Sequence, residues 1–244
     1  MSKSDYKQYY ERNRPHIHPP DSTFFITFRL AGSIPKATIK QYQAKKVWLD
    51  NELKRIARRQ DIEPSKIIEI QRESLLQFRR DWFKRFEDIL DMAKDGPMWL
   101  GENEVRQIVA EKLHEDNGKK YRLDAFCIMS NHVHVVFKPN LSENNLYEDK
   151  TSKRPKFISD EETLPQIMHS LKGSTSRKAN LFLNRTGSFW ETESYDHYIR
   201  DDAEFYRIIK YTLNNPVKAK LVNHWQEWSG THLAERLKIE SDTL

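Results

Sequence analysis

Two apolar, β-rich segments separated by only two residues constrain the fold of this chain more than any other feature. The first runs from Tyr121 to Met129 (YRLDAFCIM) and the second from His132 to Lys138 (HVHVVFK), with Ser130 and Asn131 between them. A two-residue connection between such segments is typical of an antiparallel β-hairpin. We therefore expect an antiparallel sheet built around this hairpin.

The other segments with a clear hydrophobic period are arranged around the hairpin. An aromatic and β-branched strand is expected at Thr23 to Leu30, and a last strand at Phe189 to Ile199. Helical periods cover 102–114, 164–183 and 202–215, the last ending against Pro216. Without the final helix the order is βαββαβ. We predict an α+β fold with a ferredoxin-like βαββαβ antiparallel sheet, a helical hairpin insertion and a C-terminal helix.

Three segments are predicted to be additions to this core. Residues 35–95 have a helical period that Pro64 divides into two helices. Acidic and basic residues alternate there, which favours a solvated helical hairpin over an arm that grips nucleic acid. Residues 140–162 are polar and proline-interrupted and predict a loop, and 225–244 predict a peripheral tail. We expect one elaborated domain over 1–244.

Composition excludes several functional classes. The single cysteine, Cys127, excludes a disulfide framework and a cysteine-rich zinc module, and it fits the reducing cytoplasm. No apolar run approaches the ~20 residues of a membrane span, and neither a dinucleotide nor a P-loop glycine motif occurs. A formal net charge of +5 weakly favours a polyanionic partner. We therefore expect a cytoplasmic protein without membrane association.

The sequence His132-Val133-His134 is a candidate metal motif within the second strand of the hairpin. Side chains alternate along a strand, so the two imidazoles face the same way and Val133 the other. This arrangement suits two nitrogen ligands of one divalent ion. Taken alone, a pair of half-buried histidines bonded to their neighbours is the more common explanation.

A second candidate pair, Tyr211 and Asn215, lies one turn apart near the end of the last helix. Tyr211 is ~130° from the centre of the apolar stripe and so off the core face. If this helix packs beside the histidine strand, two imidazoles and the Asn215 amide leave positions open on Mg²⁺ or Mn²⁺ for phosphate oxygens and water. Taken alone, a surface tyrosine and a helix-ending asparagine are the better explanation of the pair.

Together these motifs resemble the HUH single-tyrosine transposases, and more closely the REP-associated tyrosine transposases. The resemblance rests on Met129 to His134 followed by Tyr211-x-x-x-Asn215-Pro216, and it runs from about His16 to Val222. It is least constrained over 35–94 and 140–162. Further matching segments are Phe25 to Leu30, Gly96-Pro97-x-Trp99-Leu100, Phe189-Trp190, Tyr195-Asp196-His197-x-Ile199-Arg200 and Asn215 to Ala219.

The resemblance implies that His132 and His134 are metal ligands and that Tyr211 is the nucleophile. Relatives often have Gln at the third ligand position, where this chain has Asn215, one methylene shorter. The rival tyrosines lack the carboxamide-before-proline companion of Tyr211; they are Tyr195, Tyr198 and Tyr206.

The implied activity is Mg²⁺- or Mn²⁺-dependent cleavage and transfer of single-stranded DNA beside imperfect, REP-like palindromic hairpins, through a 5′-phosphotyrosine. The chain could act as a monomer or a homodimer. Predicted contacts to DNA phosphates, each equally explained as solvated surface, are Arg12, Arg14, Lys172, Arg177, Lys178, His197 and Arg200.

Two other functions remain open at this point. A hydrolytic nuclease would keep the metal and use water in place of the tyrosine. A non-catalytic protein would bind hairpin RNA or DNA on its sheet, although the aromatic pattern of RNA-binding sheets of the RRM kind is absent.

Overall fold

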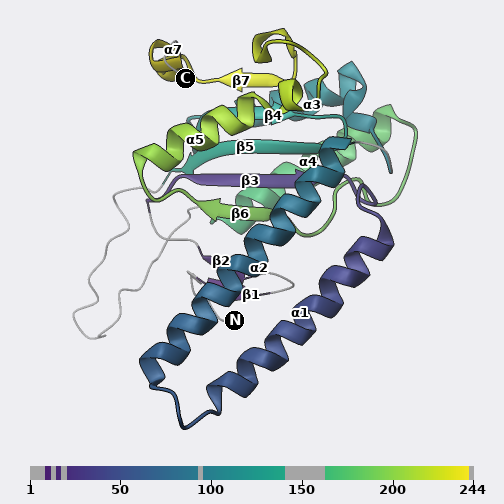
Figure 1. The fold of residues 1–244 in the computed structure, drawn as a ribbon. Helices are drawn as coiled ribbons and strands as arrows, with labels where there is room; N and C mark the ends of the chain where they lie inside the picture. Colours follow the sequence, from purple (N-terminus) through teal and green to yellow (C-terminus); the bar gives the residue numbers. More distant parts are fainter. Residues whose placement is uncertain (1–8, 12–14, 18–20, 93–95, 141–162, 242–244) are drawn as a thin grey trace, which may run out of the picture. The chain divides into compact units, whose positions relative to one another are not determined.

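The predicted hairpin lies within a five-stranded antiparallel sheet in the computed structural model, which describes residues 9–11, 15–17, 21–92, 96–140 and 163–241 (Figure 1). The strand order is β6-β3-β5-β4-β7, and every pairing is antiparallel. The bounds are β3 Phe24–Arg29, β4 Tyr121–Ile128, β5 His132–Pro139, β6 Tyr195–Tyr198 and β7 Thr231–Leu233. The predicted α+β class with an antiparallel sheet is confirmed.

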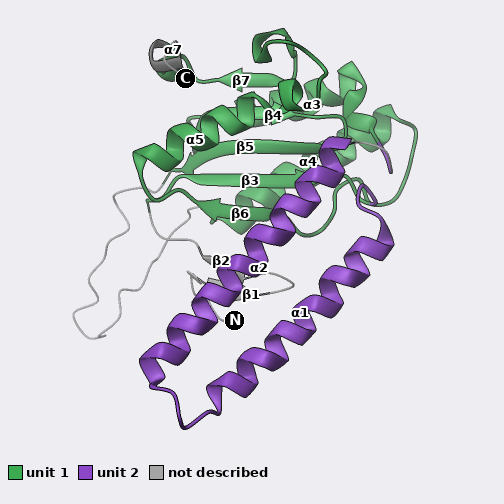
Figure 2. Ribbon diagram, in the orientation of Figure 1, with its two compact units in different colours: residues 1–31, 98–244 green, residues 32–97 purple. Residues whose placement is uncertain are grey.

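Two compact units make up the chain: residues 1–31 with 98–244, and residues 32–97 (Figure 2). The sheet belongs to the first unit, which also contains a two-stranded ribbon of β1, Tyr9–Glu11, and β2, Pro15–Ile17. Its helices are α3 Asn103–Glu115, α4 Leu164–Phe182, α5 Asp202–Leu213, α6 Asn215–Lys218 and α7 Glu235–Ser241, with short 3-10 turns at Trp99–Gly101 and Trp225–Glu227.

Alternation along the strands separates the two faces of the sheet. Ile26 and Phe28 of β3 join the apolar core with Val109 of α3 and Leu171 of α4. The side chains of Phe25 and of the residues two positions along the strand therefore lie on the opposite face of the sheet. Figure 1 shows α3 and α4 on the far side of the sheet and α5 on the near side. The first unit thus has two helices on one face and α5 on the other.

The last strand is shorter than predicted. We expected it over Phe189 to Ile199, but β6 covers only Tyr195–Tyr198. Thr27 pairs with Tyr195 and Leu30 with Trp190, so the two residues 28–29 between these pairings oppose the four residues 191–194 of the other segment. The excess residues cannot stay in the ladder and bulge out of it, which ends the regular pairing.

The expected peripheral tail also needs correction. Within 225–244, Thr231–Leu233 form β7, which pairs with β4 and extends the sheet. Leu233 and Leu237 are buried. The apolar content of this short strand was too small to stand out in the sequence, yet it covers an otherwise open edge of β4.

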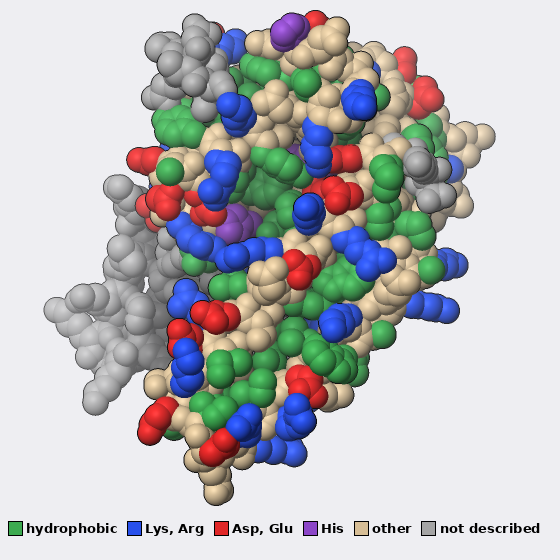
Figure 3. Space-filling model, in the orientation of Figure 1, with side chains coloured by type: hydrophobic (Ala, Val, Ile, Leu, Met, Phe, Trp, Pro, Cys, Tyr) green, Lys and Arg blue, Asp and Glu red, His purple; other side chains and the backbone are tan. Residues whose placement is uncertain are grey.

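The segment predicted as a helical insertion forms the second unit. Its helices are α1, Lys36–Ala57, and α2, Pro64–Met92. Pro64 begins α2, where a missing backbone N–H costs nothing. The unit has its own aromatic core, which contains Tyr42, Trp82 and Phe86. Basic and acidic side chains are interspersed over this unit on the face drawn in Figure 3, as expected for a solvated helical hairpin.

Two other expectations concern limited parts of the chain. The loop predicted over 140–162 lies, apart from Asn140, outside the described residues. Among the helices that the structure describes, none combines the length and apolar character needed to cross a membrane.

The side chain of His232 packs β7 against its neighbours in the first unit. Its ring stacks on Phe126 of β4 with centroids 5.2 Å apart and meets His114 of α3 edge-on at 4.5 Å. Burial, together with His114 and Lys238, lowers the pKa of His232 to about 4, against an opposing effect of Glu235. Because the folded pKa lies below the ordinary value of ~6.5, the unfolded chain takes up this proton first as the pH falls. Stability is therefore lost between these two pH values.

We expect His232→Phe, which keeps the ring stack and removes the titration, to reduce this acid destabilisation. Allowing for partial exposure of the ring, the effect is about 1–2 kcal/mol between pH 7 and pH 4.5. Urea unfolding at both pH values measures it, with the exposed His224→Phe as control. An equal loss of stability in His232→Phe and in the wild type would contradict this assignment.

Candidate metal and tyrosine site

β5 places the imidazoles of His132 and His134 side by side on the near face of the sheet. Their Nε2 atoms lie 3.0 Å apart, and both side chains are buried. The pair arises directly from the alternation of side chains along the strand, since Val133 between them enters the opposite core. Two ring nitrogens therefore converge on one point.

Two residues orient these rings through their other nitrogens. Asn131 Oδ1 lies 2.7 Å from His132 Nδ1, and Thr27 Oγ1 lies 2.8 Å from His134 Nδ1. An amide oxygen only accepts hydrogen bonds, so this contact favours the tautomer with the proton on His132 Nδ1, in which Nε2 is the ligand nitrogen. This is the usual outer support of metal-binding histidines. The sequence motif did not reveal Thr27, whose signal is its register opposite His134 on β3.

Asn215 reaches the same point from beyond the end of α5. Its Nδ2 lies 3.1 Å from His134 Nε2, and its buried Oδ1 has no hydrogen-bond partner. The continuous helix predicted over 202–215 is wrong in detail, since α5 ends at Leu213 and Asn215 begins α6. Pro216 cannot donate to the carbonyl of Thr212 and would clash with it, so the helix is interrupted.

These nitrogen and oxygen atoms are suitable ligands for a divalent cation. Adjacent ligands of an octahedral ion at 2.0–2.1 Å lie ~3 Å apart, which matches the 3.0 Å between the two Nε2 atoms. The unpartnered Oδ1 of Asn215 is a buried acceptor that a cation would satisfy. The two imidazoles are close enough to share one ion.

The ring of Tyr211 lies beside this group. Its centroid is 5.5 Å from that of His134 and 5.9 Å from that of Phe25, both in edge-on geometry. Phe25 in turn stacks on His134 at 5.5 Å. The side chain is half-buried. Tyr211 is thus positioned by α5 next to the histidine pair.

The rival tyrosines have different surroundings. Tyr195 lies on β6 opposite Thr27 and meets the other side of the same aromatic group, 6.4 Å from Phe25. Tyr198 packs against the core on the far face, and Tyr206 contacts the adjacent Phe205. Tyr211 makes an edge-on ring contact with His134.

The predicted DNA-contacting residues fall into separate places. His197 and Arg200 meet at Glu204, whose Oε1 lies 3.1 Å from His197 Nε2 and whose Oε2 accepts from the Arg200 N–H at 2.9 Å. Burial would raise the pKa of Glu204, but these bonds and the nearby positive charges outweigh it and lower that pKa. His197 is the β3 register partner of Phe25 and shares its face.

The helix α4 carries its basic residues on the far side of the sheet. Lys172 is half-buried and donates to the carbonyls of Glu191 and Thr192 at 3.0 and 3.1 Å. Arg177 and Lys178 are exposed. These three side chains therefore do not lie on the sheet face that carries His132. Arg12 and Arg14 lie outside the described residues.

Thr27→Val tests whether the hydroxyl behind His134 supports metal binding. Valine keeps the shape of the side chain and removes the hydrogen bond to Nδ1. We expect Mn²⁺ affinity to fall by ~10-fold or more, measured by calorimetric titration. Thr231→Val, which lies on the same sheet face at its far edge, is the control. An unchanged Mn²⁺ affinity in Thr27→Val would contradict this role.

Comparisons with known proteins were made by sequence and by structure. No protein-family model matches the sequence, and no curated protein matches it. One similar solved structure is described as "Structure of the REP associates tyrosine transposase bound to a REP hairpin", with 12% identity and a TM-score of 0.44. The similarity covers 95% of this chain and 82% of that one. That protein is of the family that the sequence motifs resemble.

Proposed function

We propose that this chain is a metal-dependent endonuclease and strand transferase for single-stranded DNA, of the REP-associated tyrosine transposase kind, with Tyr211 as its nucleophile. The supporting observation is the placement of Tyr211 against His134, at a histidine pair that Asn215 contacts through its Nδ2 while its Oδ1 is buried without a hydrogen-bond partner. A tyrosine, two converging imidazoles and a buried acceptor form a site for phosphodiester chemistry. The whole chain, 1–244, is proposed to act as one functional domain.

The proposed ligands of Mg²⁺ or Mn²⁺ are His132 Nε2, His134 Nε2 and Asn215 Oδ1. When bound, the ion would neutralise negative charge on the scissile phosphate. Asn131 and Thr27 hold the two rings so that their Nε2 atoms face this position. Asn215 thus has the role that the resemblance assigns to a glutamine.

Tyr211 carries out the covalent step. Its oxygen attacks the phosphorus, a bond forms between them, and the bond from phosphorus to the 3′ oxygen breaks. The phenolic proton is lost and the leaving 3′ oxygen gains one, which gives a 5′-phosphotyrosine and a 3′-OH. A phenol has a pKa of ~10 and is mostly protonated at neutral pH, so it depends on a polarised target. Because the adduct keeps a phosphodiester bond, an incoming 3′-OH can reverse the step and join strands.

The proposed substrate is single-stranded DNA beside an imperfect, REP-like palindromic hairpin. A small site reaches a phosphodiester more readily in an unpaired strand than within a duplex. His197 and Arg200, on the near face, are proposed to contact the backbone close to the site. Arg12, Arg14, Lys172, Arg177 and Lys178 are the proposed contacts farther along the DNA.

Cleavage of matched oligonucleotides tests this function. The probes are palindromic hairpins with single-stranded flanks and the same sequences fully paired, each with Mn²⁺, with Mg²⁺ or with EDTA. We expect metal-dependent cleavage within the unpaired flank and a covalent protein–DNA product resistant to boiling in detergent. Cleavage without that product would indicate a hydrolytic nuclease. Metal-independent binding without cleavage would indicate a non-catalytic hairpin-binding protein.

A further inference from the structure

One flank of α5 carries a carboxylate, a guanidinium and a phenol in succession, from Glu204, Arg207 and Tyr211. Arg207 lies one turn before Tyr211, and Glu204 one turn before Arg207, so the three side chains follow the same side of the helix. Side chains tilt toward the N-terminus of a helix, and the Tyr211 ring therefore leans over the turn that carries Arg207. The proposed nucleophile thus has a guanidinium beside it on its own helix.

This flank of α5 faces the part of the sheet that β3 and β6 form. The Tyr211 ring meets Phe25 of β3 with centroids 5.9 Å apart, and Glu204 Oε1 lies 3.1 Å from Nε2 of His197 on β6. Phe25 and His197 are register partners on the near face. The contacts of Glu204 and of Tyr211 therefore fall on adjacent residues of the sheet.

Glu204 is the common acceptor of this cluster. Its Oε1, besides contacting His197, accepts from Arg207 Nη2 at 3.3 Å, and its Oε2 accepts from the backbone N–H of Arg200 at 2.9 Å. Burial would raise the pKa of Glu204, but the bonds from Arg200 and His197 and their charges lower it on balance. The carboxylate is therefore ionised, and one of its oxygens holds His197 and Arg207 side by side.

The cluster keeps an excess of positive charge. Arg200 and Arg207 both pair with the one carboxylate of Glu204. The side chain of Arg207 is 73% exposed, and a guanidinium has five N–H donors in a planar fork. This fork matches two oxygens of a phosphate. An anion with phosphate geometry is therefore the chemistry that suits Arg207.

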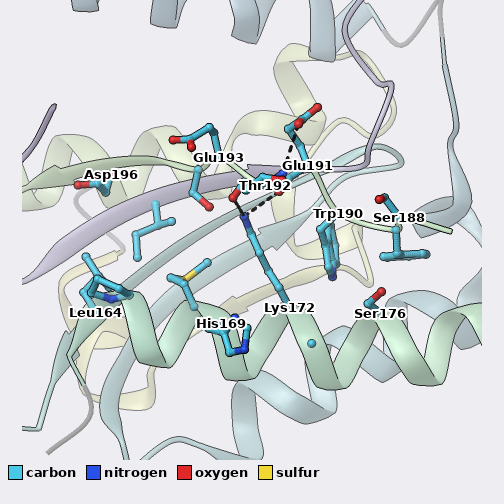
Figure 4. A pocket seen from close by; sticks show the side chains of 16 residues that line it. Leu164, His169, Lys172, Ser176, Ser188, Trp190, Glu191, Thr192, Glu193 and Asp196 are labelled. Atoms are coloured by element: carbon cyan, nitrogen blue, oxygen red, sulfur yellow. Dashed lines mark hydrogen bonds between the residues drawn. The ribbon is translucent and has the colours of Figure 1, made fainter. Parts of the chain in front are cut away.

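The far face of the sheet has a different charge pattern. A pocket of about 410 Å³ lies there between α4 and the segment 188–196 (Figure 4). Its lysine, Lys172, donates to two backbone carbonyls of that segment, and its lining includes the carboxylates of Glu191, Glu193 and Asp196. Carboxylates repel a phosphate. The positive cluster on α5 is thus the better phosphate site, and it lies on the face of the tyrosine.

We propose that Arg207 is a catalytic residue that binds a non-bridging oxygen of the scissile phosphate beside Tyr211, and that Glu204 is the positioning residue that aims it. The proposal rests on the proposed function, which supplies the phosphate. Attack by Tyr211 brings a further oxygen onto a phosphorus that already carries negative charge. A guanidinium fixed beforehand by Glu204 stabilises that charge without reorganisation.

The variant Arg207→Gln measures the catalytic contribution. At saturating hairpin DNA with Mn²⁺, we expect the single-turnover cleavage rate to fall by ~10²-fold, the loss caused by removing one donor to a reacting oxyanion. Affinity for the uncleaved hairpin in EDTA should fall by less than ~3-fold, because the other phosphate contacts remain. Lys210→Gln removes the same charge from an exposed position of α5 and should retain the wild-type rate. An Arg207→Gln rate equal to that of Lys210→Gln overturns the proposal.

A neutral phosphate identifies the group that Arg207 contacts. Replacing one non-bridging oxygen of the scissile phosphate by methyl gives a methylphosphonate without the negative charge. We expect the ~10²-fold ratio of wild-type to Arg207→Gln rates to shrink to less than ~5-fold on this substrate and to persist when the next phosphate carries the methyl group. A general structural defect would keep the ratio on both substrates. An undiminished ratio at the scissile position overturns the proposal.

The variant Glu204→Gln tests the positioning role. We expect a ~10-fold lower cleavage rate, because the guanidinium remains but is no longer held in place. In the Arg207→Gln background the same change should cost less than ~2-fold, since Glu204 acts through Arg207. Multiplied effects in the double variant overturn this role. A wild-type chain that forms the Tyr211 adduct while Arg207→Gln cleaves normally contradicts this inference alone, whereas a wild-type chain without the adduct contradicts the proposed function.

Discussion

Replacing Tyr211 by phenylalanine is expected to lower single-strand cleavage by at least ~10³-fold and to remove the covalent protein–DNA product. The change deletes one oxygen and keeps the ring that packs edge-on against Phe25 and His134. Loss of a nucleophile in other enzymes costs as much as ~10⁶ in rate. The measurement is single-turnover cleavage of a hairpin oligonucleotide with Mn²⁺.

The matched control for this change is Tyr195→Phe. Tyr195 also packs edge-on against Phe25, and it lies on the same sheet face as His134. Removing its hydroxyl is expected to change the cleavage rate by less than ~3-fold, since a hydroxyl outside the reacting group contributes little to the transition state. If Tyr195→Phe loses the adduct and Tyr211→Phe keeps it, the nucleophile has been assigned to the wrong tyrosine.

The second large effect is expected from His132→Ala and His134→Ala. Each substitution removes one of two nitrogens that lie 3.0 Å apart, and we expect Mn²⁺ affinity to fall by more than ~100-fold, because even outer-shell changes cost 10–100-fold. Calorimetric titration with Mn²⁺ measures the affinity, and cleavage across a range of Mn²⁺ concentrations measures the consequence.

Exposed His224→Ala is the control for the histidine variants and should bind Mn²⁺ as the wild type does. Thermal unfolding without metal separates loss of the site from loss of the fold. If both folded alanine variants bind Mn²⁺ with wild-type affinity, the metal is held elsewhere and the proposed ligand set is wrong.

Local periodicity was sufficient for the elements with strong apolar patterns. The hairpin of β4 and β5, the two long helices split at Pro64 and the same-face placement of His132 and His134 all follow from spacing along the chain. Each of these depends on residues that are close in sequence.

Features that depend on register between distant strands could not be predicted in this way. Thr27 supports His134 only because β3 pairs with β5 in a particular register. The bulge before Tyr195 appears only when the pairings of β3 are counted. β7 has too few residues for a clear period, and its position depends on the free edge of β4. Pairing between strands that are distant in sequence therefore determines these features, which local periodicity does not predict.

Mapping of the covalent product tests the central claim most directly. The full chain is incubated with a palindromic single-stranded hairpin and Mn²⁺, the product is digested with protease, and the DNA-bearing peptide is identified by mass spectrometry. The expected result is a peptide containing Tyr211 joined to the 5′ phosphate of the cleaved strand. Cleavage with no tyrosine-linked DNA, or linkage to a tyrosine other than Tyr211, would contradict the proposed mechanism.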